Sequence, residues 1–494
     1  MPESDTLPTT GTPQSIVVIG AGPAGLTAAV DLAESGHSVT VLESDPEYVG
    51  GIARTVSYKG YRFDIGGHRF FSKSTEITQR WKDRLSHEFI SVRRLSRIFY
   101  GGKFYDYPLK AFNALSNLGL IATAACVTSY AKAQLFPVRP ETSFATWVSN
   151  RFGRRLFNTF FKTYTEKVWG MSCDEISADW AAQRIKGLSL GKAIWNALVP
   201  QKKGGKTIKT LIDSFEYPRL GPGQMWEKYR DDLTTAGGAV RMGETVISIQ
   251  TDFDRATSVR TRDVNGVERE YEGSQFVVSM PLRDCVLAIE PPLEPKVRDA
   301  ANRLKYRDFF TVALMVKRTD LFPDNWIYIH DPSVKLGRVQ NFNNWSPEMV
   351  PDAGTTCLGL EYFCFAGDPL WNTSDEELIA LGKREIAKLG LVREDEIVDG
   401  CVVRAEKAYP IYGPGYQDDL KIIREALKQF PNLQPVGRNG MHKYNNQDHS
   451  MMTAVLAAKN INGQQFDLWK VNTDAEYHEE GDGSEDHSAV AEKA

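Results

Sequence analysis

Three glycines near the start of the chain have the spacing of a turn that holds phosphate groups. Gly20, Gly22 and Gly25 lie within six residues of one another, and Glu43 follows about twenty residues later. In such a turn the first glycine allows a sharp bend, the second lets the backbone approach a pyrophosphate, and the third lets a helix pack on a strand. The acid accepts hydrogen bonds from a ribose. These residue types and spacings predict a dinucleotide-binding site.

The segments around these residues have the order that such a site needs. The apolar run at residues 16–19 predicts a buried strand, residues 26–35 predict a helix, and residues 38–42 predict a second strand that ends at the acid. The N-terminus of the helix would direct N–H groups and a partial positive charge at the phosphates. Surface turns often match the glycine spacing alone, but the full order of elements favours a binding site.

A second glycine pair indicates which dinucleotide is bound. Gly50 and Gly51, with Arg54 after them, follow shortly after the acid. This resembles the extended fingerprint of FAD-binding proteins of the glutathione-reductase-like class, which NAD-only dehydrogenases usually lack. We therefore expect FAD, held in this part of the chain by Gly20, Gly22, Ala24, Gly25, Glu43, Ser44, Gly50, Gly51 and Arg54.

Composition sets broad limits. A chain of 494 residues should divide into two to four domains. A formal net charge of −4 argues against a nucleic-acid partner. The six cysteines form no CxxC pair and no cluster with histidine at metal-ligand spacing, so we expect reduced thiols, no metal site and a cytoplasmic location.

Three further segments bear on location and order. Residues 1–14 are polar and predict a flexible N-terminus without a secretory signal. Residues 111–131 are apolar on average but interrupted by polar residues, which predicts a buried or partly amphipathic helix and no transmembrane segment; docking on a membrane surface stays open. Residues 471–494 are acidic and predict a disordered tail.

The pattern along the chain predicts an α/β protein, with a glutathione-reductase-like Rossmann FAD domain, an inserted helical domain and an antiparallel β-sheet substrate domain. Strand-like runs occur at residues 97–100, 103–105, 239–249, 257–263 and 275–280, and residues 309–364 alternate between apolar and polar. We expect parts of the FAD domain at residues 15–105, 201–280 and 401–470, the helical insertion with a mobile substrate loop at 106–200, and the substrate domain at 281–400.

Four downstream segments are candidates for the chemistry. The first contains Gly66, Gly67 and His68, in which paired glycines would let the backbone lie against a flat ring. A strained turn with a surface histidine is the alternative. The others are residues 160–171 (Phe-Phe-Lys-Thr-Tyr-Thr-Glu-Lys-Val-Trp-Gly-Met) followed by Trp180 and Arg184, residues 326–347 around Tyr328 and Arg338, and residues 407–450 around Tyr409, Arg438 and Tyr444.

Taken in this order, the four segments resemble motifs of the UDP-galactopyranose mutase family. The resemblance spans residues 15–465 and is closest to the eukaryotic-type branch, within the superfamily of FAD-dependent amine oxidases and protoporphyrinogen oxidases. It implies that Arg184 and Arg338 grip a nucleotide-sugar diphosphate, with Gly67 and His68 beside the reactive part of the flavin. It also implies substrate contacts from Tyr107, Trp169, Tyr328, Tyr409, Tyr444 and Asn446, and cofactor contacts from Gly66, Gly67, His68, Val246, Gly437, Arg438, Asn446, Gln447 and Ser450. Outside this context, tyrosine and tryptophan are usually core residues and a lone arginine is usually solvated.

The activity that this resemblance implies is the interconversion of pyranose and furanose forms of a UDP-hexose, as in cell-wall polysaccharide biosynthesis. The two sugars have the same oxidation state, and reduced flavin acts as the nucleophile toward the anomeric carbon. NADPH or NADH would reduce the flavin. The partner is then a UDP-sugar, and whether the chain forms a homo-oligomer stays open.

Three departures from the family pattern leave the base and the sugar undetermined. Leu109 and Lys110 replace a Phe-Gln pair, no asparagine stands near Ile212, and the loop before Asn446 is two residues shorter. The alternative function is a flavin oxidase or desaturase of the protoporphyrinogen oxidase or amine oxidase type, which shares this fold. A redox-inert FAD-binding regulator is a third hypothesis.

Overall fold

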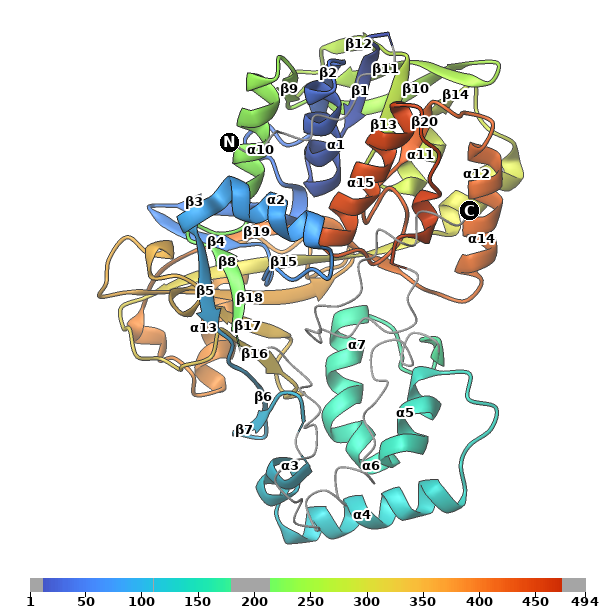
Figure 1. Ribbon diagram of the computed structural model, residues 1–494. Coiled ribbons are helices and arrows are strands. Elements are labelled where there is room, and N and C mark those ends of the chain that lie inside the picture. Colours follow the sequence, from blue (N-terminus) through green and yellow to red (C-terminus); the bar gives the residue numbers. More distant parts are fainter. Residues whose placement is uncertain (1–11, 110, 179–213, 473–494) are drawn as a thin grey trace.

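The chain forms a parallel sheet flanked by helices, a long antiparallel sheet beside it and a helical unit at the far end (Figure 1). The computed structural model describes residues 12–109, 111–178 and 214–472. The parallel sheet has the strand order β20-β13-β1-β2-β9. Its strands are β1 (Ser15–Ile19), β2 (Ser38–Glu43), β9 (Ala239–Met242), β13 (Gln275–Val278) and β20 (Leu433–Pro435). Segments from three distant parts of the sequence therefore build one sheet.

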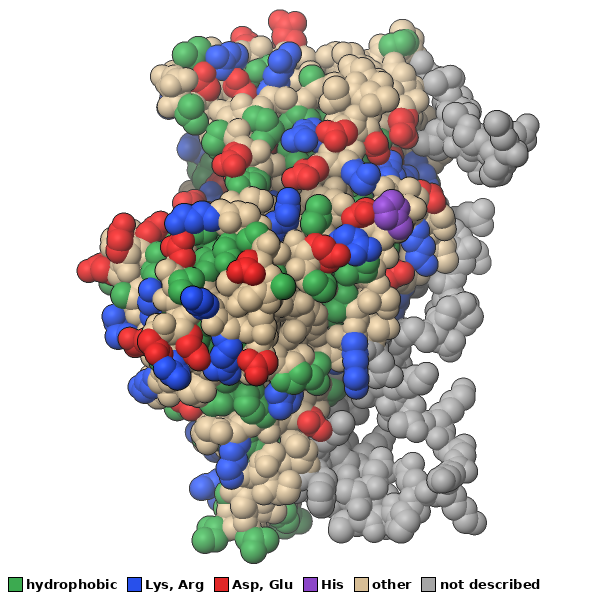
Figure 2. All heavy atoms as spheres, turned by 90° about the vertical axis from the view of Figure 1, so that its left-hand side faces the viewer, with side chains coloured by type: hydrophobic (Ala, Val, Ile, Leu, Met, Phe, Trp, Pro, Cys, Tyr) green, Lys and Arg blue, Asp and Glu red, His purple; other side chains and the backbone are tan. Residues whose placement is uncertain are grey.

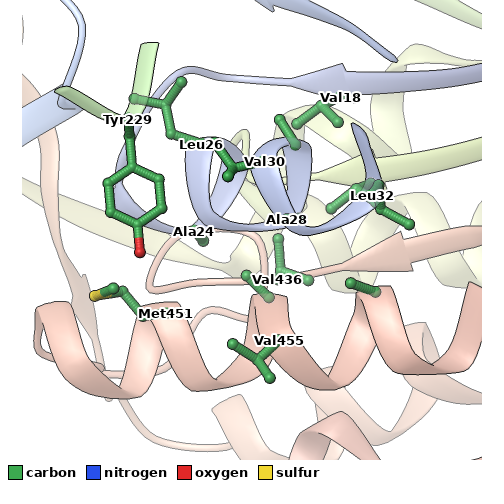
Figure 3. Packing of buried hydrophobic residues seen from close by; sticks show 14 of the residues in the cluster. Val18, Ala24, Leu26, Ala28, Val30, Leu32, Tyr229, Val436, Met451 and Val455 are labelled. Carbon is green, nitrogen blue, oxygen red and sulfur yellow. The ribbon is translucent and has the colours of Figure 1, made fainter. Parts of the chain in front are cut away.

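Helices α1 (Pro23–Glu34), α10 (Gly223–Thr235) and α15 (Gln447–Ile461) pack in one hydrophobic cluster on this sheet. Small residues allow the close approach of two of them: Figure 3 shows Ala24 and Ala28 of α1 facing Met451 and Val455 of α15. Ala24 and Ala28 are almost fully buried. Because α1 and α15 both begin at one edge of the sheet, their N-termini lie near the same space, which becomes the site described below.

A second layer covers the other face of the parallel sheet. Val17, Ile19 and Leu42 point into a cluster that contains Ile249 and Val259. This layer contains the sheet β12-β11-β10-β14, formed by β10 (Thr245–Asp252), β11 (Arg255–Arg262), β12 (Glu268–Glu272) and β14 (Ile289–Glu290). Helices α11 (Leu282–Ala288), α12 (Pro295–Arg303) and α14 (Tyr416–Leu427) contribute to the same cluster.

The seven-stranded sheet has the order β19-β15-β18-β17-β16-β6-β7. Its strands are β6 (Ser96–Tyr100), β7 (Lys103–Asp106), β15 (Lys305–Val316), β16 (Trp326–Ile329), β17 (Arg338–Asn341), β18 (Thr356–Cys364) and β19 (Ile397–Ile411). Neighbouring strands are antiparallel except β16 and β6, which are parallel. Helix α13 (Asp375–Lys388) packs on this sheet, and every residue of the interior strand β18 is buried.

The helical unit follows β7 and lies at the lower end of Figure 1. It consists of α3 (Ala111–Leu118), α4 (Leu120–Leu135), α5 (Phe144–Phe152), α6 (Arg154–Leu156), a π-helical turn at Phe157–Lys162 and α7 (Thr163–Trp169). Among the described residues, the remaining strands and α-helix are β3 (Thr55–Tyr58), β4 (Tyr61–Asp64), α2 (Thr75–Leu85), β5 (Phe89–Arg93) and β8 (Ser214–Pro218).

Two predictions from the sequence were wrong in part. The run at residues 239–249 is two strands in different sheets, because the chain turns at Gly243, which has φ +73°. The apolar stretch at 111–131 is two helices split at Gly119 (φ +84°), and the outward side of α4 is exposed rather than buried.

The predicted division into domains stays a prediction. Strands β6 and β7 belong to the seven-stranded sheet, although they lie within or across the end of the predicted segment 15–105. Strand β19 also belongs to that sheet and crosses the predicted border at residue 400. In the described parts of the chain, no helix is long and apolar enough to cross a membrane.

Candidate functional site

A cavity of about 1970 Å³ lies where the parallel sheet, the seven-stranded sheet and the helical unit meet. Pockets for small ligands usually have volumes of about 300–1,000 Å³. The cavity is therefore large enough for a dinucleotide together with a second molecule.

The glycine-rich turn after β1 forms one end of the cavity. Gly20 has φ +95°, and its N–H donates to the Leu42 carbonyl oxygen at 2.8 Å. A Cβ added to Gly25 would lie 1.8 Å from the Gly20 carbonyl oxygen, so only glycine lets α1 pack this closely on the strand. A Cβ on Gly22 would meet nothing nearer than the Gly51 Cα at 4.0 Å. Gly22 caps α1 without a side-chain bond, so open space and helix N–H groups coincide where a pyrophosphate is expected.

Glu43 lies at the end of β2 and fixes this turn. Its Oε2 accepts from the Ala21 N–H at 2.7 Å, and its Oε1 accepts from the Asp45 N–H at 2.9 Å and the Ser44 hydroxyl at 3.1 Å. Burial raises the pKa of the Glu43 carboxyl, while these donors oppose the rise. The side chain borders the cavity, as an acceptor for a ribose would.

The second glycine pair continues the same wall. Gly50 has φ +98°, and its N–H donates to the Ala21 carbonyl oxygen at 2.8 Å, which joins the two glycine segments. Arg54 Nη1 donates to the Gly51 carbonyl oxygen at 3.1 Å. The backbone of both segments is thereby held around one open space.

His68 lies on the cavity wall beside Gly67. Its Nε2 donates to the Ile65 carbonyl oxygen at 2.8 Å. Desolvation, reinforced by the positive charge of Arg438, lowers the pKa of His68 to about 4. The imidazole is therefore neutral at ordinary pH and acts as a fixed polar group rather than as a cation.

The segment before Gly66 is held by a buried carboxyl group. Asp64 accepts from the Tyr217 hydroxyl at 2.6 Å and the Thr55 hydroxyl at 3.0 Å, and Thr55 in turn accepts from the Gly223 N–H at 3.0 Å. Burial raises the pKa of Asp64 to about 7 from an ordinary value of 3.8.

The raised pKa of Asp64 predicts a pH-dependent stability. The Asp64 carboxyl binds its proton more tightly in the folded state than in the unfolded state. This difference stabilises the fold by about 4 kcal/mol below about pH 4, and the stabilisation is lost as the pH rises to about 7. We expect Asp64→Asn to unfold at higher denaturant concentration than wild type at pH 8, with the difference vanishing near pH 4. If the wild type and Asp64→Asn had the same denaturation midpoint at pH 8 as well as at pH 4, the raised pKa of Asp64 would be contradicted.

The third part of the cavity wall comes from the C-terminal region. Arg438 donates from Nε to the Asn445 carbonyl oxygen at 2.8 Å and lies 4.8 Å from the centre of the Tyr444 ring. Asn446 is the N-cap of α15 in a capping box with His449. Gly437, Gln447 and Ser450 are the other predicted cofactor residues on this wall, and Val246 of β10 borders the same cavity.

Arg338 of β17 is a fixed cation on the part of the cavity wall that the seven-stranded sheet forms. Its Nε donates to Glu361 Oε1 at 2.8 Å and its Nη2 donates to Glu361 Oε2, while Gln340 Nε2 also donates to Oε1 at 2.8 Å. Burial opposes the charge, but the adjacent Glu361 carboxylate holds the pKa of Arg338 well above its ordinary value. Two of the five N–H groups of the guanidinium thus bind Glu361 and orient the Arg338 side chain. Arg338 borders the cavity.

Aromatic side chains line the same cavity. Tyr409 and Tyr444 stack with centroids 5.8 Å apart, and Trp169 lies 6.5 Å from each. On the other side, Tyr328 lies 4.6 Å from Tyr107. Burial, followed by the neighbouring Tyr444, raises the pKa of Tyr409 to about 12, so its hydroxyl stays a hydrogen-bond donor at neutral pH.

Two cations, the half-buried Lys167 and the buried Arg307, attach α7, which carries Trp169, to the seven-stranded sheet. Lys167 Nζ donates to the carbonyl oxygens of residues 329, 331 and 336 at 3.3, 2.6 and 3.1 Å. Arg307 of β15 donates to the carbonyl oxygens of Val168 at 2.9 Å, Lys167 at 3.1 Å and Phe363 at 3.0 Å. Gly170 leaves room for Arg307, because a Cβ there would lie 2.4 Å from Nη1.

Removing Arg307 should therefore loosen the helix that carries Trp169. We expect Arg307→Met to lower the free energy of unfolding by about 3 kcal/mol, since one buried and two half-buried carbonyl groups lose a charged donor. Arg307→Lys should recover part of the loss. Arg393→Met is the control, because Arg393 is 71% exposed and pairs only at the surface with Asp395. A denaturation midpoint of Arg307→Met equal to that of the control would contradict this attachment.

The structure brings most predicted site residues to one cavity. Those that border it are Gly20, Gly22, Ala24, Glu43, Ser44, Gly51, Arg54, Gly67, His68, Tyr107, Trp169, Val246, Tyr328, Arg338, Tyr409, Gly437, Arg438, Tyr444, Asn446, Gln447 and Ser450. Gly25, Gly50 and Gly66 lie behind this lining. Arg184, Trp180, Lys110 and Ile212 lie outside the described residues.

Sequence reasoning missed Glu361, Gln340 and Tyr164. Glu361 had a recognisable signal, since it is the one charged residue in the apolar run 356–364. Tyr164 packs edge-on against Tyr328 at 5.5 Å and stacks on His330 at 4.7 Å. Its position in a helical segment gave no indication that it faces the cavity.

Comparison with known proteins identifies the family. The family model of flavin-containing amine oxidoreductases matches residues 23–461. The chain belongs to this family. Coproporphyrinogen III oxidase from Mycobacterium leprae is 24% identical over 438 residues, which cover 84% of this chain and 92% of that protein.

Solved structures have the same fold. A reduced UDP-galactopyranose mutase superposes with a TM-score of 0.78 at 23% identity, covering 94% of this chain and 98% of that one. A protein described as a putative protoporphyrinogen oxidase from Exiguobacterium sp. 255-15 gives a TM-score of 0.68 at 17% identity, covering 92% and 100%. At these identities the likeness concerns the fold alone.

Family and fold together settle the coarse description. The predicted fold class is confirmed, and the protein is a flavin-dependent enzyme with a Rossmann-like cofactor domain. The residues at the glycine-rich end of the cavity fit the diphosphate and ribose of a flavin dinucleotide. The comparisons name both an oxidase and a mutase, so the residues around Arg338, away from the glycine-rich end, have to distinguish the two reactions.

Proposed function

We propose that this protein is a flavin-dependent mutase that interconverts pyranose and furanose forms of a UDP-hexose. The observation that carries the proposal is Arg338, a half-buried guanidinium that Glu361 orients and that borders a cavity lined by tyrosine side chains. A nucleoside diphosphate leaving group develops negative charge, and a fixed cation stabilises that charge without reorganisation.

The roles proposed for the individual residues come from the resemblance to the mutase family, and the positions of the described ones on the cavity wall support them. Arg338 would hold the diphosphate, with the hydroxyl groups of Tyr328, Tyr409 and Tyr444 as further donors. Trp169 would pack against the sugar. Arg184 stays the proposed second cation; it lies outside the described residues. Gly67 and His68 would border the ring of the cofactor, which in its reduced form supplies a nucleophile for the anomeric carbon.

The site has no need of a titrating acid or base in this proposal. His68 is neutral because its pKa is about 4, and it would keep its N–H on the Ile65 carbonyl group during turnover. The aromatic wall would exclude water from the reacting centre, which protects a sugar that has lost its leaving group from hydrolysis. NADPH or NADH is the proposed reductant, and a cytoplasmic role in cell-wall polysaccharide synthesis is the proposed context.

The direct experiment is incubation of the dithionite-reduced protein with a panel of nucleotide sugars under nitrogen. We expect a new nucleotide-sugar peak of unchanged mass on chromatography, and none from the oxidised protein. To identify the reductant, NADPH and NADH are each added to the oxidised protein, and reduction is monitored as loss of the visible flavin absorbance. Absence of any isomer from every nucleotide sugar, with flavin bound and reduced, would exclude the mutase.

An oxidase of a porphyrinogen is the second candidate, and the full-length match to coproporphyrinogen III oxidase favours it. A porphyrinogen with carboxylate side chains could also pair with Arg338, so the arginine alone does not separate the two functions. Oxygen consumption separates them: an oxidase consumes oxygen in proportion to the product formed, whereas the mutase reaction has no net redox change.

A further inference from the structure

Helix α4 has an apolar surface that is exposed at the end of the molecule. Its exposed residues, here called the outer face, are Leu120, Ile121, Ala124, Val127, Thr128, Ala131, Lys132, Gln134 and Leu135. Leu120 and Ile121 are each 90% exposed, and the adjoining Phe136 is 74% exposed. Figure 2 shows apolar side chains at the lower tip, where Figure 1 places α4.

The opposite side of α4 packs against the other helices of the helical unit. Cys126 is buried and Tyr130 is half-buried in the cluster formed with α5. The Arg155 N–H donates to the Ser129 hydroxyl at 3.1 Å, and Gly153 packs against the backbone of Tyr130. Six of the nine residues of the outer face are apolar, and a contiguous exposed apolar patch usually marks an interaction surface. The outer face is therefore built to be covered by something outside this unit.

The charges around the outer face indicate what covers it. Residues 107–140 contain no Asp or Glu. Exposed basic residues lie at the two ends and along one side of α4: Lys103, Lys132, Arg139, Arg154 and Arg155. Lys103 is placed at the N-terminal end, because its Nζ donates to the Asn117 carbonyl oxygen at 2.7 Å. The next acid along the chain, Glu141, is neutralised by Arg151 at 2.8 Å.

We propose that the outer face of α4 docks this enzyme on a membrane surface that contains anionic phospholipid. Apolar side chains would enter the boundary between headgroups and acyl chains, and the surrounding cations would pair with lipid phosphates. At 16 residues, α4 is shorter than the roughly 20 residues needed to span a bilayer. The helix therefore lies on the membrane and does not cross it.

The test is sedimentation of the full-length, flavin-loaded protein with phospholipid vesicles. Vesicles of phosphatidylcholine with roughly one-third phosphatidylglycerol should bind the wild type, and pure phosphatidylcholine should bind it about tenfold more weakly. The double variant Leu120→Asp, Ile121→Asp should lose binding about tenfold or more. Both positions lie in the first turn of α4, where an acid favours the helix, so the variant should keep its circular dichroism spectrum.

The chain offers matched controls. Phe253→Asp alters an equally exposed apolar residue, 95% exposed, in the β10–β11 turn at the other end of the molecule, and should leave vesicle binding unchanged. Lys132→Glu is a second test variant rather than a control, and it should weaken binding to the anionic vesicles about fivefold or more. Binding by the double variant equal to wild type would overturn the proposal. So would a wild-type dimer in analytical ultracentrifugation that the double variant dissociates, with no vesicle binding, since the outer face would then join two copies of the chain.

Discussion

Arg338→Ala is expected to lower kcat/KM for the nucleotide sugar by about 10²–10³-fold, the loss seen when one fixed donor to a developing anion is removed. The guanidinium has its orientation set by Glu361 before any substrate binds, so no energy is needed to order it during the reaction. Arg338→Lys should recover little, because an ammonium cannot bind Glu361 and a diphosphate as a fork.

A structural effect of Arg338→Ala must be separated from the effect on turnover. The variant leaves Glu361 buried without its cation, which costs about 3–5 kcal/mol of stability. Arg97 of β6, in the same sheet, provides the control, since it makes the same two-bond contact with the fully buried Asp324 and does not border the cavity. Arg97→Ala should be destabilised similarly and, at a temperature where both variants are folded, keep its kcat/KM. Equal losses of activity in both variants would remove Arg338 from the site.

Gly22→Ala is expected to abolish flavin binding without unfolding the protein. The position has φ −79°, which alanine adopts freely, and the added Cβ has no neighbour closer than 4.0 Å. The methyl group would instead occupy the space that the pyrophosphate needs. We expect an affinity for FAD at least about 100-fold lower, measured by titration calorimetry, with the melting temperature of the flavin-free protein unchanged.

Gly25→Ala is the companion variant with the opposite pattern. Its Cβ would lie 1.8 Å from the Gly20 carbonyl oxygen and 3.0 Å from its carbon, both backbone atoms that cannot move aside. We expect a loss of about 3 kcal/mol or more in the stability of the flavin-free protein. A Gly22→Ala variant that binds flavin as tightly as wild type would contradict the assignment of the pyrophosphate to this turn.

The cofactor half of the site was predictable because its determinants are local. Gly20, Gly22, Gly25 and Glu43 lie within 24 residues of one another, and together with the apolar runs around them they specify strand, turn and helix. The parallel pairing of β1 with β2 follows from the same segment. The motif around Arg338 also directed attention to the cavity, although only by resemblance to a known family.

The supporting contacts could not be predicted, because they depend on pairing between distant segments. Arg338 meets Glu361 because β17 and β18 pair with these two residues directly opposite each other. Lys167 and Arg307 bind backbone carbonyl groups, which carry no residue-specific signal. The exposed face of α4 was missed for a related reason: mean hydropathy over residues 111–131 does not indicate which side of a helix finds a neighbour.

The most direct test of the central claim follows isomer formation and oxygen uptake in parallel, with the same preparation of flavin-loaded protein. One sample is reduced and given UDP-galactose and related UDP-hexoses without oxygen; the other is oxidised and given a porphyrinogen in air. We predict ring-size isomerisation in the first sample, with the flavin still reduced at equilibrium, and no catalytic oxygen consumption in the second. Steady oxygen uptake with the porphyrinogen, and no isomer from any nucleotide sugar, would contradict the account.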